Sequence, residues 1–266
     1  MAVERIDVPG GHLAAEIDGD GPPVVLVHAG VADRRMWDGV VPALARRHRV
    51  IRPDLRGFGE SLPASAPFSH PGDLVALMDA LGVERAAFAA SSYGGRVALD
   101  LAAAHPGRVV SLALLAAPLP GHDWSAAMRE YDAEEEAALD AGDLDKAVDL
   151  NLDMWVRGPS REWDGPLRAH AERLRRAVRV SLENQRRSGE YERGAVPDLV
   201  AALPALDLPV LVAAGTRDLP DFADLAARLA ATLPRAERVS LPGVGHLIPV
   251  EDPARTAELL LRHLSA

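Results

Sequence analysis

Positions 90–95 read Ala-Ser-Ser-Tyr-Gly-Gly and join an apolar, strand-like run to an alanine-rich, helix-like run. A serine held between a strand and a helix sits on a tight turn with its hydroxyl thrust outward, and small flanking residues let neighbouring backbone come close. Gly94 follows two residues after Ser92, which favours Ser92 over Ser91 as the tip of the turn. The stretch therefore predicts a nucleophile elbow at Ser92, with Ala90 standing where a glycine is usual.

Two later residues could complete a catalytic triad with this serine. A hydroxyl nucleophile needs a base within hydrogen-bond reach and a carboxylate that orients the base, and after such an elbow the chain order is serine, acid, histidine. Asp218 and His246 follow in that order, each just past the carboxyl end of a predicted strand, where open α/β sheets place their sites. Asp221 and, more distantly, Asp123 compete for the acidic position, and the Gly-x-x-Asp spacing favours Asp218.

Apolar runs alternate with helical segments along most of the chain, which is the pattern of a doubly wound α/β sheet. Two antiparallel strands are expected first, near Val3–Val8 and His12–Asp18. The later runs lack polar alternation, so we expect them to be fully buried, parallel strands. These runs are Val24–Val27, Arg49–Pro53, Ala86–Ala90, Val109–Leu115, Val210–Ala214 and Glu237–Leu241. The last helix is expected over Pro253–Leu264, with Asp252 as its cap.

Four motifs, in their order and spacing, resemble the α/β-hydrolase superfamily, in particular its serine esterases and perhydrolases with a helical cap. The motifs are Val-His-Ala-Gly at 27–30, Asp-Leu-Arg-Gly-Phe-Gly-Glu-Ser at 54–61, the elbow at Ser92, and Gly-Val-Gly-His at 243–246. The resemblance implies an α/β-hydrolase fold, with a mostly parallel doubly wound sheet and a helical cap insertion. It also implies that Ser92, Asp218 and His246 are the catalytic residues. Haloalkane dehalogenases and epoxide hydrolases resemble this chain except for an aspartate at the elbow, so their chemistry is not expected.

The resemblance further implies an oxyanion hole made of two backbone N–H groups. Counting along the loop after the third strand assigns one of them to Gly30, and the residue after the nucleophile, Tyr93, gives the other. Ala29 stands where the family usually has glycine, so Val31 remains an alternative to Gly30. His28 is expected to brace this loop as a structural histidine rather than to carry a proton.

The alternation of predicted strands and helices stops between about Pro118 and Pro197, where only helical segments are predicted. The family inserts its cap at this place. We therefore expect a core formed by residues 1–117 and 198–266 and a cap over residues 118–197. Pro166–Arg187 carries apolar residues at helical spacing with arginines on its other faces, which predicts an amphipathic cap helix; a basic docking surface is the alternative.

A cap above the elbow would shape the substrate pocket, so specificity is expected to reside there. Trp124, Met154 and Trp155 are the candidates for the apolar lining of that pocket. Each of them could instead pack between cap and core.

Composition narrows the classes of partner. The formal net charge of −10 and the pI near 5.4 argue against nucleic acid or an anionic membrane, because both need a positive surface. The chain has no cysteine, no apolar run of membrane-spanning length and no nucleotide-binding glycine motif. We expect a cytoplasmic protein that acts on a small molecule without metal or organic cofactor. Its oligomeric state stays open.

The predicted function is hydrolysis of a small carboxylic ester, lactone or thioester through an acyl-enzyme. Related triads also serve other reactions, so a cofactor-free lyase or isomerase and a carbon–carbon bond hydrolase remain alternatives. A hydrolase-like binding protein that recognises a small molecule with little turnover is a third.

Overall fold

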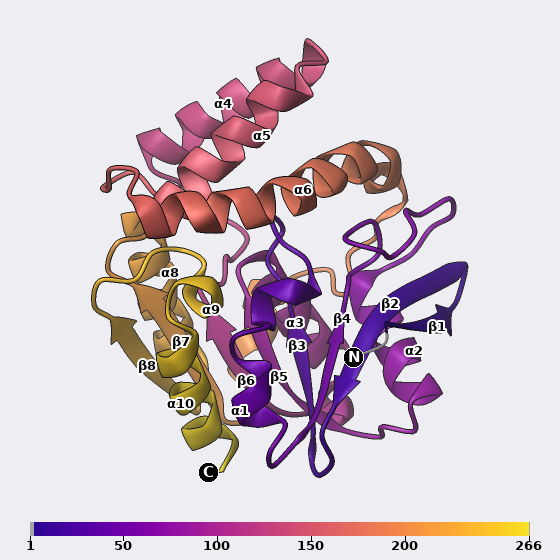
Figure 1. Cartoon of the computed structure of the whole chain (residues 1–266). Coiled ribbons are helices and arrows are strands. Elements are labelled where there is room, and N and C mark those ends of the chain that lie inside the picture. The colour runs from indigo at the N-terminus through magenta and orange to yellow at the C-terminus, as the bar shows by residue number, and fades with distance from the viewer. Residues whose placement is uncertain (1–2, 266) are drawn as a thin grey trace.

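An eight-stranded sheet forms the centre of the molecule (Figure 1), and the computed structural model describes residues 3–265 apart from the side chains of residues 186 and 188. The strands are Glu4–Val8 (β1), Gly11–Asp18 (β2), Pro23–Val27 (β3), Arg49–Pro53 (β4), Ala86–Ser91 (β5), Val109–Leu115 (β6), Val210–Gly215 (β7) and Ala236–Leu241 (β8). Their order is β1-β2-β4-β3-β5-β6-β7-β8. The pairs β1–β2 and β2–β4 are antiparallel and the others are parallel, as the sequence predicts.

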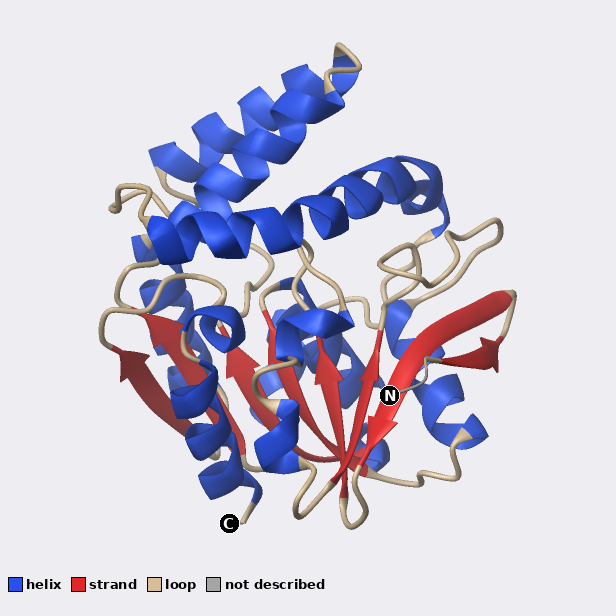
Figure 2. Ribbon diagram, viewed as in Figure 1, coloured by secondary structure: helices blue, strands red, loops and turns tan. Residues whose placement is uncertain are grey.

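Helices cover both faces of the sheet (Figure 2). On one face α1 (Val41–Leu44) packs against α10 (Pro253–Leu264), and on the other α2 (His70–Ala80) packs against α3 (Tyr93–Ala104). The remaining core helices are α7 (Leu199–Ala202), α8 (Pro220–Thr232), which packs on β7 and β8, and α9 (Ile248–Glu251). Between these layers every residue of β5 and β7 is buried, which confirms the predicted mostly parallel sheet with buried central strands.

The expectation of full burial is wrong for β8. This strand pairs with β7 alone, at the edge of the sheet, and Glu237, Arg238 and Ser240 are exposed. Only Leu241, at its end, is buried. Burial of a strand depends on its place in the sheet.

The predicted helical cap lies above the carboxyl ends of the parallel strands (Figure 1). Its helices are α4 (Ala126–Asp140), α5 (Leu144–Leu152) and α6 (Gly165–Ser188), and a π-helical turn, Asp153–Arg157, follows α5. Each helix begins at a side chain that accepts a hydrogen bond from a backbone N–H of its first turn, namely Ser125, Asp143 and Asp164. In Figure 1 α4 and α5 form a hairpin that projects beyond α6.

Helix α6 is amphipathic, as predicted. The buried side chains among its described residues are Leu167, Ala171, Leu174, Ala177, Val178, Ser181 and Leu182. On the outer face Arg175 pairs with Asp149 at 2.8 Å, and Arg179 pairs with Asp145. Part of the arginine-rich face is thus neutralised by α5 instead of forming a free basic surface. Among the helices of residues 3–265, none is long and apolar enough to cross a membrane.

The first turn of α3 lies against the end of β3, and this contact requires a glycine. A Cβ atom on Gly94 would lie 2.4 Å from the carbonyl oxygen of His28 and 2.7 Å from that of Val27. Neither oxygen can move freely, because Val27 ends β3 at the centre of the sheet and His28 is the residue bonded to it. Gly94 therefore sets the distance between the elbow and the loop after β3.

We expect Gly94→Ala to lower the free energy of unfolding by about 2 kcal/mol or more, since the added methyl group overpacks a backbone contact. Chemical denaturation measures the change. Gly107→Ala is the matched control, because a Cβ atom there meets nothing within 4 Å. Equal stability of the two variants would contradict the account of this contact.

Candidate active site

Ser92 occupies the turn between β5 and α3 with φ 50° and ψ −121°. Among the described residues, Ser92 and Ala116 are the non-glycine residues with positive φ. Such backbone typically costs about 1–3 kcal/mol and persists only where the surrounding structure enforces it. Here the Ser92 N–H donates to the carbonyl oxygen of Leu115 on β6 at 2.8 Å. Ser91, by contrast, is fully buried, and its hydroxyl has no hydrogen-bond partner in the described chain.

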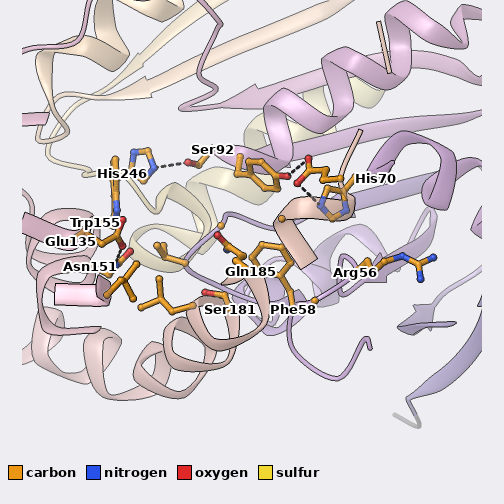
Figure 3. Close-up of a pocket in the computed structure, with 18 of the residues that line it drawn as sticks. Arg56, Phe58, His70, Ser92, Glu135, Asn151, Trp155, Ser181, Gln185 and His246 are labelled. Atoms are coloured by element: carbon orange, nitrogen blue, oxygen red, sulfur yellow. Dashed lines mark hydrogen bonds and ion pairs between the residues drawn. The ribbon is translucent and has the colours of Figure 1, made fainter. Parts of the chain in front are cut away.

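His246 joins Ser92 to Asp218 (Figure 3 shows the bond to Ser92). Its Nε2 atom lies 2.9 Å from Ser92 Oγ, and its Nδ1 atom lies 2.8 Å from Asp218 Oδ2. A carboxylate only accepts, so Nδ1 carries the proton and Nε2 is left to accept from the serine hydroxyl. The other Asp218 oxygen accepts from the N–H of Leu219 at 2.7 Å. The three predicted residues thus form one hydrogen-bonded chain.

The competing acidic residues lie elsewhere. Asp221 accepts from the N–H of Ser125 at 2.7 Å and lies 3.2 Å from Nε2 of His122, so it holds the entrance to the cap. Asp123 is fully exposed beside Arg129. Of the three candidates, Asp218 alone contacts His246 among the hydrogen bonds of the described residues.

His28 braces the loop after β3. Its Nδ1 atom donates to the carbonyl oxygen of Ala29 at 2.8 Å, and its Nε2 atom accepts from the N–H of Leu55 at 2.9 Å. Burial lowers the pKa of His28, which keeps the ring neutral and suits this pair of bonds. The ring also packs edge-on against Phe58, with centroids 5.0 Å apart.

The braced loop lies beside the first residue of α3. A Cβ atom built on Gly30 would lie 3.4 Å from Cβ of Tyr93, so their backbones approach closely. No described residue accepts a hydrogen bond from the N–H of Gly30, Val31 or Tyr93. Gly30 and Val31 both line the cavity above Ser92, and the choice between them as an oxyanion donor stays a prediction.

A cavity of about 420 Å³ lies between the core and the cap, with Ser92 and His246 in its wall (Figure 3). The core contributes Gly30, Val31, Arg56, Gly57, Phe58, Phe68, His70 and Tyr93. The cap and the segment after it contribute Tyr131, Glu135, Leu139, Asn151, Trp155, Ser181, Leu182, Gln185, Gly189 and Glu192. This volume suits a small organic molecule.

Of the three aromatic and apolar candidates, Trp155 alone belongs to this lining. Its ring lies 4.5 Å from that of His246, and its Nε1 donates to the hydroxyl of Tyr131 at 3.0 Å. Trp124 instead packs on Phe222, and Met154 packs against the core outside the cavity. The expectation that Trp124 and Met154 line the pocket is therefore wrong. Both side chains pack between the cap and the core instead.

Most of the cap lining escaped the sequence analysis. Tyr131, Glu135 and Leu139 are spaced four residues apart on α4 and share one face of it, which is a signal that the sequence does contain. On the opposite side of the cavity Tyr93 donates from its hydroxyl to Glu192 at 2.8 Å. Burial lowers the pKa of the neighbouring His70 to about 3, so this histidine is neutral near pH 7.

The cap also holds the loop that carries His246. Arg161, which follows the π-helical turn, donates from Nη1 and Nη2 to the carboxylate of Glu251 at 2.5 and 3.2 Å. Glu251 Oε2 in turn accepts from the N–H of Gly245, next to His246, at 3.0 Å. Both charged side chains are mostly buried, so this ion pair connects cap to core directly behind the histidine.

No group of three or more His, Cys, Asp or Glu side chains that could hold a metal ion occurs among the residues described.

Comparison of the sequence with protein families identifies the family to which this chain is similar. The profile of the α/β hydrolase fold family matches residues 22–253. A stretch of 104 residues is 40% identical to the 2-hydroxymuconate semialdehyde hydrolase of Pseudomonas sp. (strain CF600), covering 36% of this chain and 37% of the relative. Another, of 156 residues, is 40% identical to a pimeloyl-[acyl-carrier protein] methyl ester esterase of Aeromonas hydrophila, covering 57% and 61%.

These stretches span less than two thirds of either curated relative. A solved hydrolase structure from Pseudomonas aeruginosa matches over almost the whole length, covering 99% of this chain and 98% of the other. Its TM-score is 0.78 and its sequence is 29% identical.

We expect Arg161→Met to lower the free energy of unfolding by about 3 kcal/mol, since it leaves the buried carboxylate of Glu251 without its cation. The double variant with Glu251→Gln should recover part of this loss, because the amide still accepts from Gly245 and carries no charge. Arg262→Met is the control, as its pair with Glu237 is exposed. Additive effects of the two substitutions in a double-mutant cycle would disprove the coupling.

Proposed function

The chain belongs to the α/β-hydrolase fold family, and on that premise we propose that it is a serine hydrolase of small carboxylic esters, lactones or thioesters. The observation that carries the proposal is the continuous chain from Ser92 Oγ through His246 to Asp218, at 2.9 and 2.8 Å, in the wall of a cavity. A nucleophile, a base and an orienting acid at these distances are what acyl transfer requires.

In the first half of the proposed reaction, His246 Nε2 takes the proton of Ser92 as Oγ bonds to the carbonyl carbon of the substrate. Asp218 keeps the imidazole in the required tautomer and stabilises the imidazolium ion. The carbonyl oxygen becomes an oxyanion. When the carbon–oxygen or carbon–sulfur bond to the leaving group breaks, the imidazolium gives its proton to that group and an ester on Ser92 remains.

In the second half, water enters the cavity and loses a proton to His246 as it attacks the acyl carbon. The bond to Ser92 Oγ then breaks, the serine regains its proton from His246, and the acid product leaves. Each half passes through a tetrahedral oxyanion. The N–H groups of Tyr93 and of Gly30 or Val31 are proposed to stabilise it, and one such donor typically contributes about 100- to 1,000-fold to turnover.

Carbon–carbon bond hydrolysis is the second candidate, and the local 40% identity to a semialdehyde hydrolase favours it. The same serine and histidine would serve, but the leaving group would be carbon and would need a proton at carbon. The esterase relative, which matches over a longer stretch of this chain, favours the ester reaction. Assay of esters beside a vinylogous diketone substrate separates the two.

We expect one equivalent of a small fluorophosphonate to attach to the wild-type protein, with loss of fluoride and a bond from Ser92 Oγ to phosphorus. Intact mass and peptide mapping locate the adduct. Ser92→Ala and His246→Ala should show none, whereas Ser91→Ala, which alters a buried hydroxyl without a partner in the described chain, should still react. An adduct that persists in Ser92→Ala, or no adduct on folded wild-type protein, would refute the proposed nucleophile.

We expect Asp218→Asn to lower kcat for an ester by about 10,000-fold, because the amide favours the wrong histidine tautomer. Asp221→Asn is the matched control, since Asp221 bonds the start of the cap instead of His246. Steady-state kinetics compares the two, with circular dichroism to show that both are folded. Should Asp221→Asn be the more damaging change, the assignment of the acid is wrong.

A further inference from the structure

The charged groups of the cavity wall do not balance. Arg56 supplies a cation, but its Nε and Nη2 atoms each donate to the carboxylate of Asp73 at 2.7 Å. The carbonyl oxygens of Pro9 and Gly10 accept from the same guanidinium at 2.9 and 3.1 Å. This cation is thus neutralised and its donors are largely engaged, so it offers little to an anionic ligand.

Glu192 and Glu135 are the carboxylates of the wall. Glu192 accepts a hydrogen bond from the neutral hydroxyl of Tyr93, and its one ion-pair partner among the described residues is His70, at 3.9 Å. The buried ring of His70 is itself neutral near pH 7. Glu135 forms no ion pair with any described residue. Near pH 7 the lining therefore has negative charge that no cation of the described chain compensates.

Glu135 is held in place from one side only. Its Oε1 atom accepts from Nδ2 of Asn151, whose amide is fixed by the carbonyl oxygen of Ala147 at 2.9 Å. The hydroxyl of Tyr131 lies 3.0 Å from the same Oε1 and 2.9 Å from Oδ1 of Asn151, so these two acceptors share its one proton. Oε2 accepts no hydrogen bond from any described residue. Figure 3 shows Glu135 and Asn151 beside Trp155, with Arg56 and His70 on the far side of Ser92.

We propose that Glu135, held by Tyr131 and Asn151, is the specificity site for a positively charged group on the substrate. This rests on the proposed function and assigns the ester class that the cavity prefers, namely small esters carrying an ammonium group in either the acyl or the alcohol part. The rings of Trp155 and Tyr131, with centroids 5.5 Å apart, lie at the same end and provide aromatic surface for a cation. A carboxylate-bearing ester is rejected, because it would meet Glu135 without a free cation among the described residues of the lining.

Two pairs of esters of equal shape test this inference. The first is butyrylcholine beside 3,3-dimethylbutyl butyrate, with the charge in the alcohol part. The second is ethyl 4-(trimethylammonio)butanoate beside ethyl 5,5-dimethylhexanoate, with the charge in the acyl part. For each pair kcat/KM is measured in the wild type and in Glu135→Gln, which keeps the shape and the acceptor oxygen.

The expected result is that the ratio of kcat/KM for the charged ester to that for its neutral partner falls about 10-fold or more in Glu135→Gln, for at least one pair. Because each ratio is compared between variants, differences in the intrinsic reactivity of the two esters cancel. Glu134→Gln is the matched control, because Glu134 is exposed on the same helix and outside the lining, and its removal changes net charge equally. Equal ratios in all three proteins, or a loss in Glu192→Gln instead, would overturn the assignment.

Binding separates this inference from the proposed chemistry. The same four esters are titrated by calorimetry into Ser92→Ala and into Ser92→Ala combined with Glu135→Gln. A preference for the charged ester that disappears in the double variant supports the site even if the wild type hydrolyses none of the four esters, an outcome that would count against ester hydrolysis alone. Turnover of neutral esters without any such preference would sink the charge site alone.

Discussion

The left-handed backbone at Ser92 is the constraint around which the site is built. A serine in this conformation needs outside support, and its N–H donates a hydrogen bond to the carbonyl oxygen of Leu115 on the neighbouring strand. It also needs room for the helix that follows. Gly94 fits against the carbonyl oxygen of His28, and a Cβ atom on Gly95 would lie 2.6 Å from that of Ala117. The sheet therefore supplies the rigidity that keeps a strained turn in place.

The histidine is held differently, from the core and the cap together. Asp218 binds one ring nitrogen, while Trp155 and Phe222 pack on the ring with centroids 4.5 Å away. Behind it, the pair between Arg161 and Glu251 ties the preceding residue to the cap. A base that contacts elements from both parts of the chain keeps its orientation only while those parts stay together. The cap thus helps to orient His246 in addition to forming a wall of the cavity.

The sequence predicts those features that are fixed by local chemistry. Turns at strand ends restrict residue types strongly, so the elbow at Ser92 and the positions of Asp218 and His246 could be found from short patterns. The lining of the cavity could not, because it depends on how α4, α5 and α6 pack on the core. Trp124 and Trp155 are alike as residues, yet only the second reaches the cavity. The exposure of β8 follows from its edge position, and its polar residues Glu237, Arg238 and Ser240 are a signal of this that the sequence does contain.

The proposed nucleophile, base and acid all come from loops at the ends of strands, whereas Glu135 and Asn151 come from the α4–α5 hairpin, which projects away from the sheet. A substitution on the inner face of that hairpin changes which molecules the cavity can bind without altering any strand. The sequences of the hairpin and of the strand-end loops can therefore change at different rates during evolution. A lineage with this architecture can acquire new substrates by substitutions in α4 and α5, while selection preserves the proposed catalytic residues at the strand ends.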